Sequence, residues 1–456
     1  MNLNDTISAI STPIGEGGIS VTRISGSNSF GITEKIFFKD TARNRKISIQ
    51  ETASHTIHFG YLFDGENQID EVMVSIFKKP NSYTGEDTIE ISSHGGVLVT
   101  QKILSLTIKS GARHAEPGEF TKRAFLNKRL DLSQAEAVAD LIKAKTDSAH
   151  ESSLKQLEGS LSKYISTVRQ EIIDATSLIE LELDFSEEDI EFVPKDEFRN
   201  KISGIVEKLN EIISSYISGK IIRDGINLVI SGRTNSGKSS LFNQLLKSDR
   251  AIVSNISGTT RDYLQENIVI DGILFNLIDT AGIRQSEDVI ETEGIKRSFR
   301  KIEEADFILY LIDSTESMDF IENEAEYFKN NFDLKKSIPV FTKKDIGKVR
   351  KGEISISVYD EGSIKELKSS ITGKINESAN VKTGSEIILT NLRHKLCIES
   401  VVNSLEQVIS GIDRKMSGEF ISVDLRNALN YLGEITGEVT NEEILNNIFK
   451  NFCIGK

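Results

Sequence analysis

The stretch GRTNSGKS at residues 232–239 decides the fold of the middle of this chain. An apolar run at 226–230 precedes it and a helical pattern at 241–246 follows it, so the order is strand, glycine-rich turn and helix. The spacing G-x-x-x-x-G-K-S in that context predicts a loop whose backbone N–H groups, with the helix N-terminus, surround a polyphosphate. The Ser239 hydroxyl is expected to bind Mg²⁺. The residues predicted to contact the nucleotide here are Asn235, Ser236, Gly237, Lys238, Ser239 and Ser240.

Two further motifs predict the parts that respond to a γ-phosphate. The sequence DTAG at residues 279–282 ends an apolar strand, so Asp279 can hold Mg²⁺ through water and the Gly282 N–H can contact the γ-phosphate. The segment SGTTRD at 257–262 lies between this motif and the loop, and Thr260 is predicted to bind Mg²⁺ in the triphosphate state. The predicted nucleotide contacts of these two segments are Thr259, Thr260, Asp279, Thr280, Ala281 and Gly282.

The sequence TKKD at residues 342–345 follows another apolar strand and predicts recognition of guanine. Asp345 can accept two N–H bonds from the guanine edge, while the stem of Lys343 covers the base. Ser357 and the backbone of Val358 are expected to complete the base contacts. Motifs of this kind usually begin with asparagine, and here Thr342 removes an amide but leaves the discriminating aspartate in place. Four elements in this order predict a GTPase.

Residue Ile283 bears on how hydrolysis is catalysed. Ras-type GTPases carry at this position a glutamine that orients the attacking water, and isoleucine cannot do so. Glu291 is the predicted replacement, acting through water; the alternative is that it is one solvated acid among several. No arginine finger is evident, and a monovalent cation can supply the missing positive charge. The predicted ligands of that cation are the Asn235 side chain and oxygens of Ser254, Ile256 and Thr259.

The composition is that of a protein with several globular domains. The chain has 456 residues, of which 38% are hydrophobic and 27% charged, and this length exceeds one ordinary core. Two cysteines, Cys397 and Cys453, are too few for a disulfide framework and suit a reducing cytosol, so a cytoplasmic protein is expected. No signal peptide and no membrane-spanning apolar run are visible. The net charge of −14 argues against a broadly basic nucleic-acid surface.

The patterning predicts a multidomain protein of α/β and all-α parts. Residues 1–119 form a predicted α+β domain, with strands at 19–24, 56–61, 71–76 and 88–91 and a helix at 97–109. Helical patterning covers 120–219, including an apolar stripe at 154–165, and resumes over 379–456. Residues 220–378 alternate strands and helices, as a parallel sheet does. We expect one helical domain into which a Ras-like P-loop GTPase domain is inserted. Its strands are expected near 228, 275–278, 307–312, 338–341 and 354–357.

Motifs outside the GTPase region show a family resemblance. They include YTGED at 83–87, SHGG at 93–96, DLSQAEA at 131–137, GEITGE at 433–438 and the terminal CIGK at 453–456. With these, the chain resembles the MnmE (TrmE) family of tRNA-modification GTPases over its whole length. The resemblance implies an N-terminal domain that binds 5-formyl-tetrahydrofolate or a related folate and forms a homodimer, followed by a helical domain that carries the GTPase domain.

The resemblance also implies partners and residue roles. The family works with the FAD-dependent MnmG, in a heterotetramer or larger complex, to add an aminomethyl-type group to the wobble uridine of tRNA, and its hydrolysis depends on K⁺. Asn235 then matches a K⁺-binding residue and Glu291 the residue that orients water. Cys453 matches a cysteine implicated in the modification. The residues that match folate contacts are Arg23, Glu90, Arg129 and Lys456.

Three hypotheses follow for the function. The first is a GTP hydrolase coupled to tRNA modification. The second is a GTP-dependent ribosome-assembly factor that uses hydrolysis as a timer and does not bind folate. The third is a folate-dependent one-carbon enzyme with a regulatory GTPase domain. The nitrogen donor, glycine or ammonium, is left open.

Overall fold

The computed structural model describes residues 5–184, 194–249, 265–279, 305–348, 352–379, 387–440, 442–450 and 452–456. Its contacts divide the chain into two units. The first comprises Met1–Ala139, Gln156–Gln170 and Leu429–Lys456, and the second comprises Asp140–Lys155 and Glu171–Ala428. Among the helices of these described ranges, none is both long enough and apolar enough to cross a membrane.

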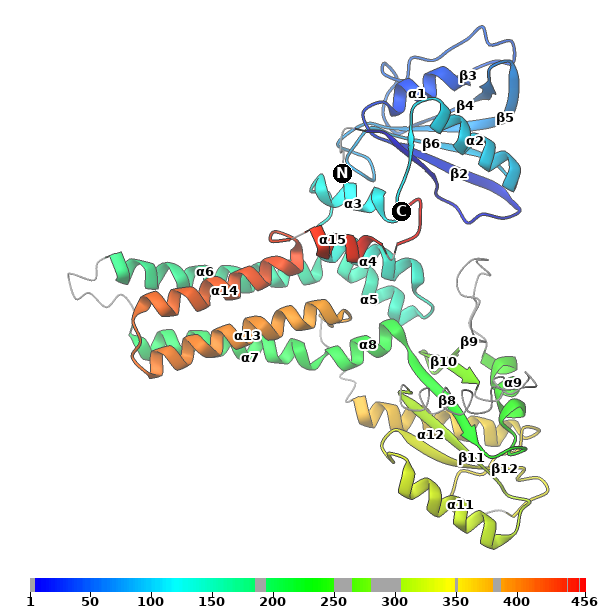
Figure 1. Ribbon diagram of the computed structural model, residues 1–456, viewed down its shortest axis with the longest axis vertical. Coiled ribbons are helices and arrows are strands. Elements are labelled where there is room, and N and C mark those ends of the chain that lie inside the picture. The colour runs from blue at the N-terminus through cyan, green and yellow to red at the C-terminus, as the bar shows by residue number, and fades with distance from the viewer. Residues whose placement is uncertain are drawn as a thin grey trace, which may run out of the picture. The chain divides into compact units, whose positions relative to one another are not determined.

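The first unit is built on a seven-stranded sheet with the order β3-β4-β5-β6-β2-β1-β7 (Figure 1). All neighbouring strands are antiparallel except β1 and β7. Helices α1 (Ser29–Ile36) and α2 (Val97–Lys109) cover one face of the sheet. The strands are β1 (Ile7–Ile10), β2 (Gly17–Ser25), β3 (Phe37–Phe38), β4 (Thr56–Asp64), β5 (Asn67–Phe77), β6 (Thr88–Gly95) and β7 (Arg113–His114).

Alternation along the strands gives this sheet one buried and one open face. Val74, Ile89 and Ile91 point to the helices and are buried, since successive side chains of a strand alternate between faces. The residues next to them along each strand point the other way. This second face carries exposed large apolar side chains, namely Ile19, Ile57, Phe59 and Met73.

The predicted elements of this unit match observed ones, and the shortest elements were missed. The predicted strands lie within β2, β4, β5 and β6, and the helix predicted at 97–109 is α2. The sequence did not predict β1, α1, β3 or β7. Strands β3 and β7 have only two residues each, so they are too short to produce an alternating pattern.

The C-terminal end of the chain packs into the first unit. Helix α15 (Glu442–Phe449) contacts α3 (Glu119–Leu126), and Phe449 and Phe452 join a buried cluster with Leu132 of α4 (Leu132–Lys143). Gly118, before α3, has a φ of 68°, and a Cβ there would lie 2.7 Å from the Phe449 carbonyl oxygen. Glycine is therefore required for α3 and the C-terminal segment to approach this closely.

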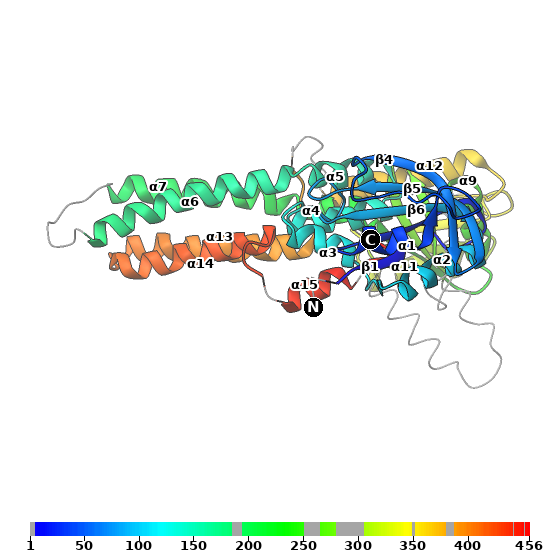
Figure 2. The same cartoon turned by 90° about the horizontal axis from the view of Figure 1, so that it is seen from above.

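Helices of the second unit include a long antiparallel pair. Helix α7 (Lys195–Ser214) runs beside α13 (Leu392–Asp413), as Figures 1 and 2 show. The apolar stripe predicted at 154–165 is not one helix face, because Gly159, with a φ of 86°, separates α5 (Asp147–Leu157) from α6 (Ser160–Asp184). Leu154 is 39% exposed, whereas Leu161 is buried. Helix α8 (Tyr216–Asp224) also belongs to this unit, as does α14 (Gly418–Thr436) up to Ala428.

A second sheet, also in this unit, has five strands in the order β12-β11-β8-β10-β9. Strands β8, β10, β11 and β12 are parallel, and β9 is antiparallel to β10. The strand predicted at 354–357 is wrong in part, since only one isolated bridge, between Phe341 and Ser355, forms there. The elements are β8 (Ile226–Gly232), α9 (Lys238–Asp249), β9 (Gln265–Ile270), β10 (Ile273–Asp279), β11 (Phe307–Asp313), α11 (Met318–Asn331), β12 (Ser337–Thr342) and α12 (Glu361–Ala379).

The chain enters and leaves this sheet domain at neighbouring points. Gly219 in α8, on the way in, lies against Leu389 on the way out, so closely that a Cβ on Gly219 would be 2.0 Å from the Leu389 carbonyl oxygen. The Ser215 hydroxyl accepts a hydrogen bond from the Leu389 N–H at 3.0 Å. The sheet domain is thus an insertion in a helical domain, as the sequence predicts.

Candidate functional site

The glycine-rich loop joins the end of β8 to the first turn of α9. Positive φ angles occur at Gly232 (137°), Asn235 (62°) and Gly237 (92°). A Cβ on Gly232 would lie 2.5 Å from the Leu311 carbonyl oxygen of β11, so only glycine fits there. The Lys238 ammonium donates to the carbonyls of Gly232 at 3.0 Å and Arg233 at 2.6 Å. The loop thus has the compact, wound backbone that directs N–H groups toward an anion.

The helix start and the strand ends place the other predicted residues around this loop. Ser239 and Ser240 are exposed in the first turn of α9, where a hydroxyl can reach a metal ion bound to phosphate. Strand β10 pairs in parallel with β8, with Asp279 opposite Ile230. The backbone of Asp279 therefore reaches the same sheet edge as the loop, beside its first residues.

Thr342 connects the base-recognition motif to the loop. Its hydroxyl donates to the carbonyl oxygens of Ser236, at 2.9 Å, and Ile312, at 3.3 Å, and its side chain is buried. The threonine therefore binds the phosphate-binding loop directly, although it lacks the amide that is usual at this position. The sequence showed that the asparagine was missing but did not show this contact.

The rest of the base-recognition region is assembled by main-chain bonds. The Lys344 N–H donates to the Ile356 carbonyl at 3.0 Å, and this keeps the segment with Ser357 and Val358 beside the TKKD motif. Ser357 is buried, and its N–H donates to the Ser363 hydroxyl at 3.1 Å. Asp345 is exposed. The arrangement leaves the Asp345 carboxylate accessible to a base.

We expect Thr342→Val to weaken GTP binding by about three- to tenfold, because a buried carbonyl loses its donor at a net cost of about 1 kcal/mol. The measurement is a titration with a fluorescent GTP analogue. Thr342→Ser keeps the hydroxyl and is the matched control, with an affinity close to that of the unaltered protein. Equal affinities for the valine and serine variants would contradict the role given to this hydroxyl.

Two carboxylates beside the loop, Asp313 and Glu324, were not found from the sequence. Lys343 pairs with Asp313 at the end of β11. Burial raises the pKa of Asp313, but hydrogen bonds from Lys343 and Thr315 lower it by more than burial raises it, so the net shift is downward. Arg233 donates to Glu324 at 2.7 Å, and Glu324 also accepts from Tyr310 at 2.7 Å. Glu324 is buried, so a carboxylate on α11 anchors the second residue of the loop.

Several predicted residues lie outside the described part of the chain. The structure therefore says nothing of their placement or of the Mg²⁺ and cation sites that need them, and the side chain of Asp279 is not described either. Within the described ranges, no group of three or more His, Cys, Asp or Glu side chains could hold a metal ion. The predicted residues that lie outside are Ser254, Ile256, Thr259, Thr260, Thr280, Ala281, Gly282 and Glu291.

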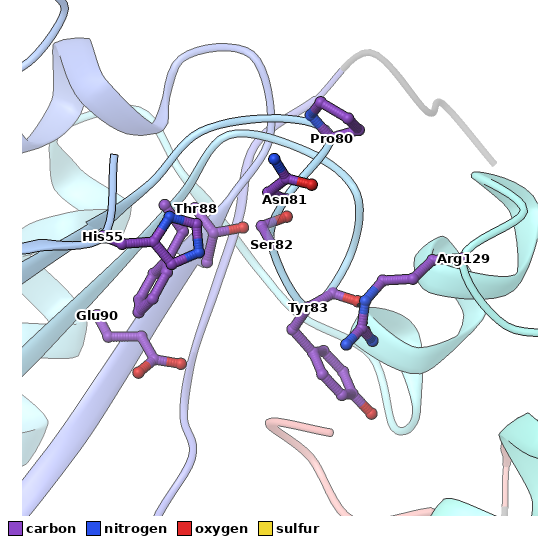
Figure 3. Close-up of a pocket in the computed structure, with 9 residues that line it drawn as sticks. His55, Pro80, Asn81, Ser82, Tyr83, Thr88, Glu90 and Arg129 are labelled. Carbon is purple, nitrogen blue, oxygen red and sulfur yellow. Dashed lines mark hydrogen bonds between the residues drawn. The ribbon is translucent and has the colours of Figure 1, made fainter. Parts of the chain in front are cut away.

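The first unit contains a separate pocket of about 520 Å³. Glu90 and Arg129 line it together with Tyr83, as Figure 3 shows. Arg129 donates to the Tyr83 carbonyl at 3.0 Å and lies over the Tyr83 ring, 5.2 Å from its centroid. The volume is in the range of small-molecule sites. The remaining lining residues are His55, Phe77, Pro80, Asn81, Ser82 and Thr88.

Arg23 and Lys456 adjoin this pocket from distant parts of the sequence. Arg23 pairs with Glu90 at 2.9 Å and lies 4.9 Å from the centroid of the Tyr83 ring, which thus contacts two guanidinium groups. Burial lowers the pKa of Lys456, and the nearby charge of Arg23 lowers it further. Strands β2 and β6 place Arg23 directly opposite Glu90. The four predicted residues therefore converge on one region.

Hydrogen bonds hold the C-terminal residues against this unit. The Gly455 carbonyl accepts from the Ser11 hydroxyl at 3.2 Å and from Arg23 at 3.4 Å. The Gly118 N–H donates to the Cys453 carbonyl at 3.4 Å. The Cys453 thiol is exposed, so its sulfur is accessible to a reaction partner.

The parallel sheet, the wound loop at the end of its central strand and the adjacent base-recognition region together define a P-loop GTPase, and the chain is a GTP hydrolase. Two family models match it: the MnmE helical domain, over residues 132–453, and the GTP-binding protein TrmE N-terminus, over residues 6–129. The chain belongs to the MnmE family of tRNA modification GTPases.

Individual relatives support this assignment over the full length. The chain is similar to tRNA modification GTPase MnmE of Christiangramia forsetii, with 41% identity over 480 residues and 100% of each chain covered. It is also similar to the protein of the same name from Acetivibrio thermocellus, with 44% identity and 100% of each chain covered. Among solved structures, the G domain of FeoB from T. maritima matches 33% of this chain and 98% of its own at 24% identity; its TM-score of 0.25 supports no conclusion.

Proposed function

We propose that this protein is a K⁺-dependent GTP hydrolase that helps to attach an aminomethyl-type group to the wobble uridine of tRNA, with a reduced folate as the one-carbon donor. An FAD-dependent, MnmG-like protein is the proposed partner, in a heterotetramer or larger complex in the cytoplasm. The observation that carries the folate part of the proposal is the convergence of Arg23, Glu90, Arg129 and Lys456 around Tyr83.

The chemistry of this pocket suits 5-formyl-tetrahydrofolate. A pterin ring has N–H groups that can donate hydrogen bonds to a carboxylate such as that of Glu90, and the flat face of the pterin can stack on the Tyr83 ring. The glutamate tail of folate carries carboxylates, for which Arg129 and Lys456 are complementary cations. Burial lowers the pKa of Lys456, and a bound anion close to the ammonium would favour its charged form and so raise this pKa again.

Mg²⁺ and K⁺ are proposed for the GTPase domain. Mg²⁺ would be held by Ser239, Thr260 and the phosphates, and it would neutralise charge that develops during phosphoryl transfer. Asn235 lies in the loop with its side chain exposed, and it would provide an oxygen to K⁺ together with Ser254, Ile256 and Thr259. Glu291 would orient water in place of the missing glutamine, in GTPase domains that pair during hydrolysis.

We expect GTP hydrolysis to be about tenfold faster in K⁺ than in Na⁺, since a cation replaces an arginine finger. Asn235→Ala should abolish this difference while retaining GTP binding. The measurement is phosphate release at matched ionic strength in the two salts. Equal rates for the unaltered protein in K⁺ and Na⁺ would exclude the proposed role of Asn235.

The open face of the first sheet supports the proposed homodimer. Ile57, Phe59 and Met73 are 62%, 49% and 42% exposed, and Phe59 and Met73 are directly paired across β4 and β5. Neighbouring exposed apolar side chains usually mark an interface. Arg23 and Glu90 lie on the inner strands β2 and β6 and point to this same face, so a second copy seated there would lie next to the folate pocket.

A titration of the full-length protein with 5-formyl-tetrahydrofolate tests the proposed function. Saturable binding is expected, and loss of binding in Arg23→Ala would connect it to this pocket. Absence of binding, together with GTP-dependent association with ribosomes, would favour an assembly factor instead.

Cys453 is proposed to take part directly in the modification, so Cys453→Ser should lose wobble-uridine modification but retain GTP hydrolysis.

A further inference from the structure

The turn before β4 holds His55 in a backbone conformation that histidine seldom adopts. Its φ is 62°, in the left-handed region. The His55 N–H donates to the Ile76 carbonyl at 2.7 Å, and the Lys78 N–H donates to the Ser54 hydroxyl oxygen at 2.9 Å. Hydrogen bonds on both sides of the turn therefore maintain it. Residues kept in strained conformations by their surroundings are concentrated at ligand sites.

The imidazole ring of His55 is fixed on two sides. Its Nδ1 is 2.8 Å from the Ser54 hydroxyl, and its ring meets Phe77 edge to face, with centroids 5.4 Å apart and an interplanar angle of 89°. The Ser54 oxygen already accepts from Lys78, and its own hydrogen finds an acceptor in Nδ1. In the tautomer in which the Ser54 hydroxyl donates to Nδ1, the ring carries its proton on Nε2, where it is available as a donor.

The available nitrogen belongs to a ring that lines the pocket of Figure 3. In that view His55 lies on one side of the pocket, and Tyr83 and Arg129 lie across from it. Glu90 is engaged by Arg23, and Arg129 by the Tyr83 carbonyl. In the described part of the chain, no hydrogen-bond partner occupies the Nε2 of His55. The ring thus offers the pocket a donor that the protein itself does not use.

We propose that His55 is a ligand-binding residue of this pocket, whose Nε2–H donates a hydrogen bond to a carbonyl or carboxylate oxygen of the bound molecule. This inference rests on the proposed function, in which that molecule is a reduced folate with both kinds of oxygen. Neither the P-loop chemistry nor the four predicted folate contacts assigns a role to His55. A molecule held between Tyr83 and His55 is recognised from both sides of the pocket.

The test is calorimetric titration of the full-length protein with 5-formyl-tetrahydrofolate. His55→Phe keeps a ring against Phe77 but removes the donor, and a loss of affinity of about three- to tenfold is expected, which corresponds to one ordinary hydrogen bond. His55→Asn suits the left-handed turn and keeps a donor on a shorter side chain, so a smaller loss is expected. His114→Phe, which alters a histidine on β7 that does not line the pocket, is the control and should bind normally.

The outcomes separate this inference from the proposed function. If the unaltered protein binds folate and His55→Phe binds it equally well, the role of His55 is wrong and the folate proposal stands. If the unaltered protein does not bind folate, both are wrong. If His55→Phe fails to fold, as judged by its melting curve and GTP hydrolysis, His55→Asn decides: weaker binding supports the inference, and unchanged binding overturns it.

Discussion

Replacing Arg123 by methionine is expected to destabilise the first unit by about 3–5 kcal/mol, the usual cost of breaking a buried ion pair. The Arg123 side chain is fully buried, and its guanidinium binds Asp5 at 2.5 Å, Glu119 at 3.1 Å and Glu86 at 3.2 Å. It also donates to the Asp5 carbonyl at 3.0 Å. Methionine fills part of the space but leaves the carboxylates without this partner. Arg113 still reaches two of them, so the fold should survive.

Hydrogen exchange measures this effect inside one unit of a multidomain chain. Amides of β1 and α3 that exchange through global opening should exchange about 10²–10⁴ times faster in Arg123→Met. Lys109→Met, which removes the exposed pair with Asp64, is the control and should leave these rates nearly unchanged. Unchanged β1 and α3 exchange in Arg123→Met would mean that the buried cluster does not support the fold.

The same cluster predicts sensitivity to acid. Burial raises the pKa of Glu119. Hydrogen bonds from Arg113, the Glu116 backbone and Arg123 lower this pKa by more than burial raises it, so the pKa lies below its ordinary value of 4.5. A lowered carboxyl pKa stabilises the fold above the ordinary value, and this stabilisation is lost as pH falls through the folded-state value. The first unit should therefore lose stability below about pH 4.5.

Replacing Gly455 by alanine is expected to lower the affinity for 5-formyl-tetrahydrofolate by more than about tenfold. A Cβ at Gly455 would lie 2.2 Å from the Ile10 carbonyl oxygen, and the φ of 95° is unfavourable for alanine. The C-terminal residues would have to move, and they would carry Lys456 away from Arg23 and Glu90. Basal GTP hydrolysis should not change, because the nucleotide-binding loop belongs to the other unit.

The matched control is Gly15→Ala, because a Cβ at Gly15 meets nothing within 4 Å. Calorimetric titration with the folate compares the two variants with the unaltered protein. Normal folate affinity in Gly455→Ala would show that the C-terminal tail does not help to form the pocket.

The GTPase region could be predicted from sequence because its signals are local. A strand, a glycine turn and a helix follow one another around Gly232, and each has its own hydrophobic period or turn chemistry. What the sequence did not show is contact between such segments. From the sequence, Thr342 shows only that the usual asparagine amide is absent, whereas in the fold its hydroxyl donates a hydrogen bond to the Ser236 carbonyl. Glu324 is one acid among many on α11 until the fold places it beside Arg233.

The residues at the pocket of the first unit could be predicted only from the family resemblance. Arg23 and Glu90 are ordinary alternating residues in sequence, and they meet because β2 and β6 pair in a particular register. Tyr83 was noted only as part of a motif, although its ring contacts both Arg23 and Arg129. His55 has no sequence signal, since its left-handed backbone and fixed ring depend on Ile76 and Phe77 of β5 and on Lys78, which follows that strand.

Mass spectrometry of wobble nucleosides tests the central claim most directly. The gene is deleted in its own organism, and the tRNA of that strain is compared with tRNA from strains that carry the unaltered protein or Lys238→Ala. The account predicts that aminomethyl-type wobble uridines disappear in the deletion strain, return with the unaltered protein and do not return with Lys238→Ala. An unchanged set of wobble nucleosides in the deletion strain would contradict it.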